Sequence, residues 1–209
     1  MFDRHLLPIL RPILDRPAGA LAARAVTADQ VTMAGFGIGV LAVLCLWSGA
    51  FGLALVLVRM NRAADGLDGA VARLTVPTDR GAFLDIALDF VFYALVPLGF
   101  ALADPAANAL PAAILIAAFV GTGSSFLAFA TIAAKRGLSA DAYPSKGIYY
   151  IGGLTEGAET IFLFIAMCLW PAAFPALAIT FAALCALTTV ARWHQGWTAF
   201  DPMTQKLSQ

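Results

Sequence analysis

The sequence has few cysteines and few charged residues. Only three of its 209 residues are cysteines, and only 12% are charged. The cysteines, Cys45, Cys168 and Cys185, all lie in apolar stretches. Their odd number and their spacing support neither a disulfide framework nor a zinc site. We therefore interpret them as small packing residues.

The first 26 residues lack the continuous apolar core of a signal peptide, so we expect no cleavable signal here. Apolar residues instead recur near helical spacing, with charged residues between them: Phe2, Leu6, Leu10, Ile13 and Leu14. This pattern predicts an amphipathic helix that lies on a membrane surface, and a frayed tail is the alternative. Pro8, Pro12 and Pro17 predict that the helix is broken into short pieces.

Long apolar stretches dominate the rest of the chain. Hydrophobic residues make up 61% of the sequence, and the mean hydropathy is +0.83. Stretches of about 18 or more apolar residues indicate transmembrane helices. Six such stretches occur: Val31–Trp47, Phe51–Arg73, Arg80–Ala103, Leu110–Ala134, Gly157–Pro171 and Pro175–Trp193. We therefore predict an all-α integral membrane bundle, with a juxtamembrane segment at 1–26, a six-helix domain at 27–199 and a polar cytoplasmic tail at 200–209.

Positive charge is confined to one side of this predicted bundle. When six helices are threaded with the N-terminus inside, all 13 lysines and arginines fall on the inner side. They are Arg4, Arg11, Arg16, Arg24, Arg59, Arg62, Arg73, Arg80, Lys135, Arg136, Lys146, Arg192 and Lys206. Basic residues concentrate on the cytoplasmic side of membrane proteins. We therefore expect both termini and any site near these residues to be cytoplasmic, in a bacterial inner membrane.

Two features are expected at the first of these helices. Thr27 or Asp29 can cap its N-terminus. Gly35 and Gly39 lie one turn apart within it, a spacing that lets a neighbouring helix approach closely.

Four aspartates interrupt the second and third apolar stretches. Asp65 and Asp68 are three residues apart, and Asp85 and Asp89 are four apart, so each pair shares one helix face. A carboxylate in hydrocarbon costs at least roughly 2.5 kcal/mol, so the group needs compensating cations. The short turn between the two stretches predicts antiparallel neighbouring helices whose aspartates meet at one depth. The carboxylates could then bind one or two hard divalent ions.

The same residues form a pattern known from a protein family. Asp65-x-x-Asp68-Gly69-x-x-Ala72-Arg73, followed by Gly81-x-x-x-Asp85-x-x-x-Asp89, resembles the signature of the CDP-alcohol phosphotransferases. These are integral membrane enzymes of phospholipid synthesis. Residues 26–32, which end at Thr32, resemble the family's Thr-Pro-Asn-x-x-Thr entry into the first helix. Here Ala28 and Asp29 replace Pro and Asn.

The resemblance implies a reaction. A phosphatidyl group would move from a CDP-linked lipid, such as CDP-diacylglycerol, to an acceptor alcohol, and CMP would leave. It also implies a pair of Mg²⁺ or Mn²⁺ ions held by Asp65, Asp68, Asp85 and Asp89, with Asp89 as the general base. The nucleotide-binding residues it implies are Asp68, Gly69, Ala72, Arg73, Gly81 and Thr32. A homodimer is implied in the same way, and the expected partners are the CDP-lipid, the alcohol and the bilayer, with no nucleic acid.

Small residues and one arginine of this pattern also have a physical rationale. Gly69, Ala72 and Gly81 lack bulk, so a flat nucleotide could press against the helix backbone. Arg73 could pair with a phosphate through its planar fork of donors.

The acceptor alcohol is less defined. Lys135, Arg136, Lys146 and Arg192 could together bind a phosphate on the acceptor, as in family members that use glycerol 3-phosphate or inositol phosphate. The alternative is a cluster of inner-side charges without a substrate role, with an unphosphorylated acceptor such as serine or inositol. Glu156 and Glu159 either form a solvated interfacial face or neutralise cations of a substrate pocket.

Two other functions are compatible with aspartates inside membrane helices. A diphosphate-binding prenyltransferase also uses carboxylate pairs, but its usual pattern lacks the Gly-x-x-Ala-Arg interval. A metal or proton transporter would place polar groups across the whole bilayer. In this sequence the acids gather on one side, which favours the transferase.

Overall fold

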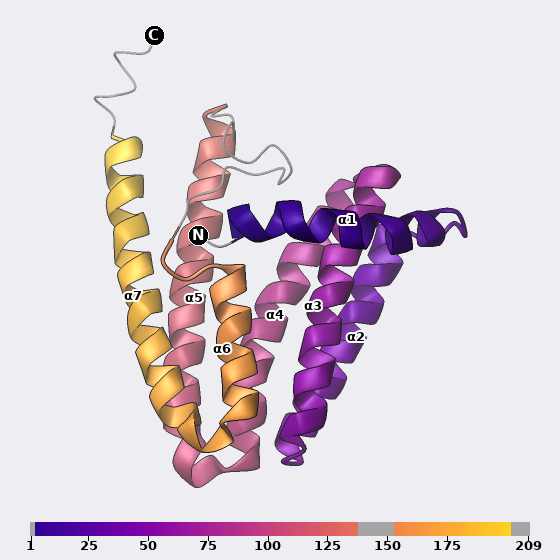
Figure 1. Cartoon of the computed structure of the whole chain (residues 1–209). Helices are drawn as coiled ribbons and strands as arrows, with labels where there is room; N and C mark the ends of the chain where they lie inside the picture. The colour runs from indigo at the N-terminus through magenta and orange to yellow at the C-terminus, as the bar shows by residue number, and fades with distance from the viewer. Residues whose placement is uncertain (1–2, 138–152, 202–209) are drawn as a thin grey trace.

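The computed structural model describes residues 3–137 and 153–201, with side chains from Pro12 onward. These residues form helices joined by short links, with no strand among them (Figure 1). The helices are α1 (Asp3–Ala22), α2 (Ala28–Trp47), α3 (Phe51–Leu74), α4 (Asp79–Ala103), α5 (Pro105–Lys135), α6 (Gly157–Leu169) and α7 (Phe174–Ala199), with the 3-10 turn η1 (Pro171–Ala173) before α7. The predicted all-α fold is confirmed for this part of the chain.

Helices α2 to α7 run alternately up and down, and α1 lies across one end of them (Figure 1). Each of the six predicted apolar stretches corresponds to one of these helices. Among the described residues, four segments are long and apolar enough to cross a membrane: Ala28–Trp47, Asp79–Ala103, Pro105–Lys135 and Pro171–Ala199. Helix α3 falls below this criterion because it carries the charged residues of the aspartate pattern, and α6 because it has only 13 residues.

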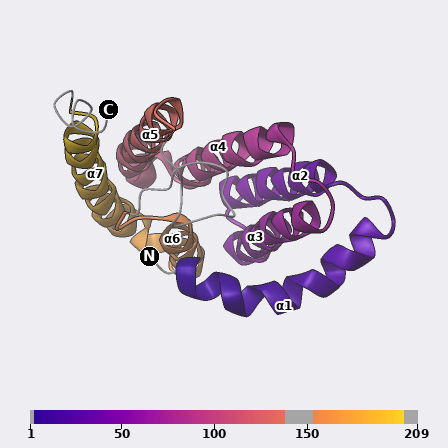
Figure 2. The ribbon, with the colours of Figure 1, turned by 90° about the horizontal axis from the view of Figure 1, so that it is seen from above.

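The prediction that prolines break the N-terminal helix is wrong. Helix α1 is continuous through Pro8, Pro12 and Pro17, although it is visibly curved when viewed from the end of the bundle (Figure 2). Its second half packs on α3, where Ala18 lies fully buried against Ala70 and Val71. This apolar contact holds the helix together although each proline removes one backbone hydrogen bond.

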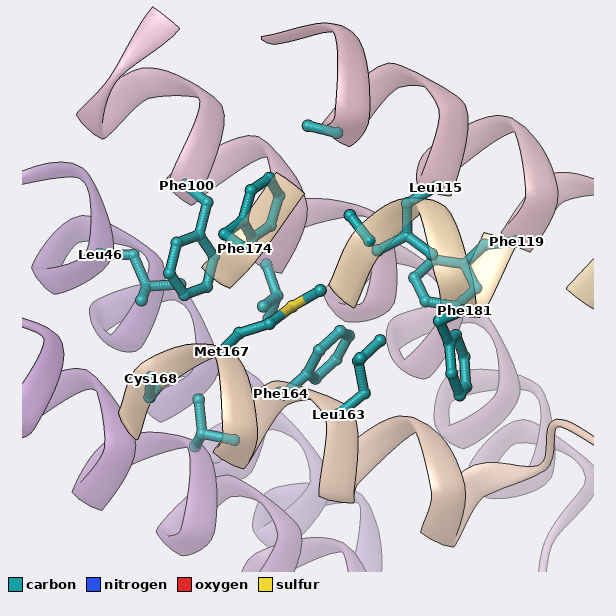
Figure 3. Packing of buried hydrophobic residues seen from close by; sticks show 14 of the residues in the cluster. Leu46, Phe100, Leu115, Phe119, Leu163, Phe164, Met167, Cys168, Phe174 and Phe181 are labelled. Atoms are coloured by element: carbon teal, nitrogen blue, oxygen red, sulfur yellow. The ribbon is translucent and has the colours of Figure 1, made fainter. Parts of the chain in front are cut away.

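The core lies among α2 to α7, away from α1. It is dominated by aromatic rings: Phe100 stacks on Phe174 with 4.6 Å between centroids, and Phe92 meets Phe164 edge-on at 6.1 Å. Figure 3 shows Met167 filling the space between these rings and Leu163. The cysteines Cys168 and Cys185 belong to the same core, Cys45 packs against it, and all three are free thiols. Their interpretation as packing residues is confirmed.

Helix α2 lies against both α3 and α4, as the end-on view shows (Figure 2). A Cβ atom at Gly35 would lie 2.8 Å from Cβ of Ala64, and one at Gly39 would lie 2.8 Å from the ring of Phe92. The close approach predicted for these glycines is therefore confirmed, to α3 for the first and to α4 for the second.

The expectation that α3 and α4 are antiparallel neighbours is only partly correct. They run antiparallel, but α3 packs mainly on α2 and α4 packs on both α2 and α5, while contact between the backbones of α3 and α4 is weak at most. The sides on which they face each other carry the aspartates, and charged side chains cannot form an apolar helix contact. The two helices therefore stand apart at the height where their carboxylates meet.

The N-terminus of α2 is capped by Thr27. Its hydroxyl accepts from the Gln30 backbone N–H at 3.3 Å, and the Gln30 side chain accepts from the Thr27 N–H at 3.0 Å, which completes a capping box. Of the two predicted caps, Thr27 is confirmed. Asp29 lies in the first turn and instead pairs with Arg80 at the start of α4, with Nε 2.7 Å and Nη2 2.6 Å from one carboxylate oxygen.

We expect Gly35→Ala to destabilise the bundle. The added Cβ would collide with the short side chain of Ala64, so α2 and α3 must separate, at a cost of about 1–3 kcal/mol. Gly37→Ala is the matched control, since nothing lies within 4 Å of a Cβ at Gly37. Thermal unfolding of the two variants in detergent checks this, and equal Tm values would contradict it.

Candidate metal and active site

Three aspartates converge between α3 and α4. One carboxylate oxygen from each of Asp65, Asp85 and Asp89 lies within 4.8 Å of the other two. The helix register explains the meeting. Asp65 lies fourteen residues after the start of α3 at Phe51, and Asp89 lies fourteen residues before the end of α4 at Ala103. Both are therefore about 21 Å from the same end of the bundle, since an α-helix rises about 1.5 Å per residue.

This donor set fits a hard divalent cation. Carboxylate oxygens are the ligands that Mg²⁺ and Mn²⁺ prefer. Around an octahedral ion with bonds of about 2.1 Å, ligand oxygens lie at most about 4.2 Å apart. The three oxygens here are within 4.8 Å of one another, so a small rotation of the side chains brings them into range. Asp85 is exposed to the side from which an ion can enter.

Asp68 is held beside this group rather than within it. Its Oδ2 accepts a hydrogen bond of 2.6 Å from the hydroxyl of Thr32 on α2, and its side chain is buried. Asp68 and Thr32, both predicted as nucleotide-binding residues, are therefore joined directly by a hydrogen bond. The fourth carboxylate faces the same cleft as the other three.

All four aspartates line one cleft between α2, α3 and α4. Its volume is about 270 Å³. Helix α2 closes its back, while α3 and α4 form its sides. The lining residues are Thr32, Gly35, Phe36, Asn61, Arg62, Asp65, Asp68, Asp85, Leu88, Asp89 and Phe92. The cleft can therefore place a polar ligand against the carboxylates while apolar rings bound it on the core side.

Arg62 is a site residue that the sequence analysis did not single out. Its Nη2 donates to Oδ1 of Asp89 at 2.7 Å, and its Nη1 lies 3.6 Å from Oδ1 of Asp65. The guanidinium thus bridges the two helices that bear the carboxylates. A signal was present in the sequence, because Arg62 precedes Asp65 by three residues and a cation in an apolar stretch needs a partner on its own face.

Asn61 is a second residue that was missed. It is buried, its amide donates to the backbone carbonyl of Gly35 at 2.9 Å, and its carbonyl oxygen accepts from Nε of Arg62 at 2.9 Å. An asparagine within an apolar stretch could have marked this position. The residue connects the backbone of α2 to the arginine in the cleft.

The small residues of the family pattern lie near the mouth of the cleft but do not line it. A Cβ at Gly69 would have only Nη1 of Arg73 nearby, at 3.5 Å, so the space over Gly69 is open. Ala72 is half-buried, and Arg73 is exposed. That these positions bind a nucleotide stays a prediction.

Gly81 serves a different purpose in this structure. A Cβ there would lie 3.0 Å from a carboxylate oxygen of Asp29 and 3.1 Å from the hydroxyl of Thr78. The space beside Gly81 is therefore occupied by α2 and by the cap of α4. The lack of a side chain allows the Asp29–Arg80 pair to form, which joins the starts of α2 and α4.

The three predicted acceptor-binding cations within the described residues are not brought together. Arg136 donates to the carbonyl of Phe200 at 3.0 Å and lies over its ring, so it ties α5 to the end of α7. Arg192 is buried and donates to the carbonyl of Thr122 at 3.0 Å. Thr122 precedes Lys135 by thirteen residues, which is about 20 Å along α5. Lys135 is exposed, and Lys146 lies outside the described residues.

The two glutamates at the start of α6 have structural contacts. Glu156 is buried and accepts from the Gly153 N–H at 2.9 Å, and Glu159 accepts from the Glu156 N–H at 3.2 Å. The interpretation as a solvated face is therefore wrong for Glu156, because its carboxylate satisfies backbone groups ahead of α6.

Comparisons with known proteins agree with this geometry. The sequence model of the CDP-alcohol phosphatidyltransferase family matches residues 25–198. The inner membrane protein YnjF of Escherichia coli strain K12 is 52% identical over 206 residues, which is 99% of this chain and all of that protein.

Solved structures of one enzyme are also similar. The phosphatidylinositol phosphate synthase PgsA1 of Mycobacterium tuberculosis, in complex with manganese and citrate, superposes with a TM-score of 0.72 at 24% identity, covering 90% of this chain and 92% of that one. The same enzyme with CDP-DAG bound gives a TM-score of 0.67 at 26% identity, covering 91% and 98%. The fold is therefore shared with that enzyme over nearly its whole length.

We expect Mn²⁺ to stabilise the protein through the three carboxylates. At 100 times its Kd, a ligand that binds only the folded state adds about 2.7 kcal/mol. Asp85→Asn removes one ligand oxygen and should reduce the Mn²⁺-induced rise in Tm. Asp79→Asn, at the exposed start of the same helix, should leave that rise unchanged. An undiminished rise in the Asp85 variant would contradict the metal site.

Proposed function

The chain belongs to the CDP-alcohol phosphatidyltransferase family, and on that premise we propose that it transfers a phosphatidyl group from a CDP-linked lipid to an acceptor alcohol. The observation that carries the proposal is the convergence of Asp65, Asp85 and Asp89 in a cleft between α3 and α4. The structural similarity to an enzyme that binds CDP-DAG and manganese supports a CDP-lipid donor, such as CDP-diacylglycerol, and a divalent cofactor.

The four aspartates would together hold a pair of divalent ions, either Mg²⁺ or Mn²⁺. A bound divalent ion would neutralise the diphosphate of the donor and the phosphate that leaves with CMP. Asp65 and Asp85 face each other from opposite sides of the cleft. Asp68, fixed by Thr32, would hold the side of the ion site nearest α2. The open space over Gly69, with Arg73 beside it, would take the nucleotide.

We propose Asp89 as the general base. Arg62 holds Oδ1 of this carboxylate at 2.7 Å, which leaves Oδ2 to accept a proton. In the proposed reaction the acceptor hydroxyl oxygen attacks the phosphorus that carries the lipid, and the hydroxyl proton passes to Asp89. The bond from that phosphorus to CMP then breaks, and CMP leaves with the electron pair.

The apolar helices and the inner membrane relative make this an integral inner membrane protein. We propose that all six helices α2 to α7 cross the bilayer. Exposed tryptophans support this: Trp47 and Trp170 lie at the end of the bundle away from α1, and Trp193 and Trp197 lie near the end of α7. Such aromatic side chains favour the two membrane interfaces. Helix α3 turns Arg62, Asp65 and Asp68 into the cleft. Its apolar residues Leu53, Val56 and Met60 are exposed.

The orientation proposed for the protein follows from its basic residues. The described lysines and arginines lie in α1 and just after it, from the middle to the end of α3, at the start of α4, around the end of α5 and in the last part of α7. These segments lie toward the end of the bundle that α1 covers (Figure 1). We place this end in the cytoplasm, with α1 in the interface as part of segment 1–26 and the bundle at 27–199. Most of the tail at 200–209 lies outside the described residues.

For the acceptor, we propose only its chemical class, which is an alcohol. Of the three predicted cations that the structure describes, Arg192 is the buried one, and its position between α5 and α7 favours a substrate role over a solvated charge. Arg136 and Lys135 fit the alternative of inner-side charges without a substrate role. Family membership favours the transferase over the prenyltransferase and transporter functions. The homodimer remains a prediction from the resemblance.

We expect Asp89→Asn to abolish transfer while the protein stays folded in detergent. Loss of a general base lowers the rate by roughly 10²–10⁴-fold. Release of CMP from CDP-diacylglycerol, with Tm measured on the same sample, checks both parts. Asp79→Asn should keep full turnover. Normal turnover by the Asp89 variant would remove this residue from the base role.

We expect CMP release to require both an acceptor and a divalent ion. The purified protein would be incubated with CDP-diacylglycerol and, in turn, labelled glycerol 3-phosphate, inositol phosphate, serine or inositol. Turnover with one of these acceptors identifies the substrate class, and excess chelator should stop it until Mg²⁺ or Mn²⁺ is restored. Full activity in chelator, or no CMP release with any alcohol, would contradict the proposed function.

A further inference from the structure

We propose that Arg62 is a positioning residue of the active site, which fixes Asp89 and competes with divalent ions for the carboxylates. The inference rests on the proposed function, because it assigns a role to a residue of the same cleft. It concerns a position outside the aspartate pattern that identifies the family.

The contacts of Arg62 join both sides of the cleft. Its Nη2 donates to Asp89 of α4 at 2.7 Å, and its Nη1 lies 3.6 Å from Asp65 one turn further along α3. Charge-assisted hydrogen bonds of this length are among the strong ones in proteins. Because α3 and α4 barely pack against each other, this bridge fixes the spacing of their carboxylates where apolar contact does not.

The guanidinium is itself held in one orientation. Asn61 accepts from Nε at 2.9 Å, and the Asn61 amide is anchored on the backbone of Gly35 in α2. The rings of Phe92 and Tyr93 lie 5.1 Å and 5.7 Å from the guanidinium carbon. Only 14% of the Arg62 side chain is exposed. An arginine held by partners on α3 and α4, one of which is anchored on α2, is preorganised and does not need to search for its hydrogen bonds.

Two consequences follow from this placement. Asp89 presents a fixed oxygen to the cleft, because its other oxygen is bound to Arg62. A divalent ion that binds near Asp65 and Asp89 also meets a fixed positive charge, which weakens its binding by electrostatic repulsion. Arg62 therefore limits how tightly the site holds its ion while it keeps the base in place.

A purely structural arginine would behave differently. It would affect folding without changing ion affinity in the folded protein. Arg59 provides the comparison, because it lies on the same helix three residues earlier and is exposed. A lysine at position 62 separates charge from geometry, since it keeps the positive charge but lacks the planar fork that reaches two partners.

The experiment compares Arg62→Gln, Arg62→Lys and Arg59→Gln with the wild type in detergent. Mn²⁺ affinity is measured from the EPR signal of free Mn²⁺, and kcat is measured from CMP release. We expect Arg62→Gln to bind Mn²⁺ roughly tenfold more tightly or better, because the repulsion is gone. We expect Arg62→Lys to keep the wild-type Kd but to lose roughly 100-fold in kcat, because Asp89 is no longer fixed. Arg59→Gln should match the wild type in both.

Each outcome decides the inference. An unchanged or weaker Mn²⁺ affinity in Arg62→Gln would overturn the competition, and wild-type kcat in Arg62→Lys would overturn the positioning. If Arg62→Gln does not fold, the kcat of Arg62→Lys alone decides whether Arg62 positions Asp89. If the wild type neither binds Mn²⁺ nor releases CMP, the proposed function fails and this inference falls with it. If the wild type binds Mn²⁺ and releases CMP, and the Arg62 variants have the same Mn²⁺ affinity and kcat, this inference is refuted while the proposed function stands.

Discussion

The structure depends on one electrostatic constraint: carboxylates placed within apolar helices must be balanced by positive charge. An unbalanced carboxylate at membrane depth costs at least roughly 2.5 kcal/mol, and here four of them face one cleft. The chain supplies part of the balance itself. Arg62 contacts Asp65 and Asp89, and the Thr32 hydroxyl satisfies an oxygen of Asp68. The remaining negative charge is what makes the cleft a site for a cation, so the residues that solve the folding problem also define the chemistry.

Helix α2 is the scaffold on which this balance is built. Its Gly35 and Gly39 let α3 and α4 pack closely on it, and the Gly35 carbonyl anchors Asn61. Asp29, at its start, joins α4 through Arg80. Because α2 holds both helices, they can stand apart where their charged faces meet. A directly packed pair would have left no cleft, and the carboxylates would have been forced against one another without room for a ligand.

The sequence predicted the features that depend on local pattern. Apolar length predicted the six helices α2 to α7, and the short turn between the second and third stretches predicted that their aspartates would meet at one depth. Features that depend on three-dimensional contact could not be predicted in this way. The continuity of α1 through three prolines needs its packing on α3, and the separation of Arg136 from Arg192 follows from contacts to different parts of the helices. Arg62 was counted as one more inner-side charge. Its spacing from Asp65 indicated a partner on the same helix, but the contact with Asp89 on α4 depends on the three-dimensional arrangement.

Phe92 connects the stability of the bundle to the chemistry of the cleft. On one side its ring lies 5.1 Å from the Arg62 guanidinium, and on the other it meets Phe164 of the core edge-on. The same ring fills the space left by Gly39 on α2. Protein interiors are packed so densely that a displacement of one buried side chain is transmitted to its neighbours. Any change that moves Phe92 is therefore expected to move Arg62, which holds Asp89, so this ring links the packing of the core to the geometry of the cleft.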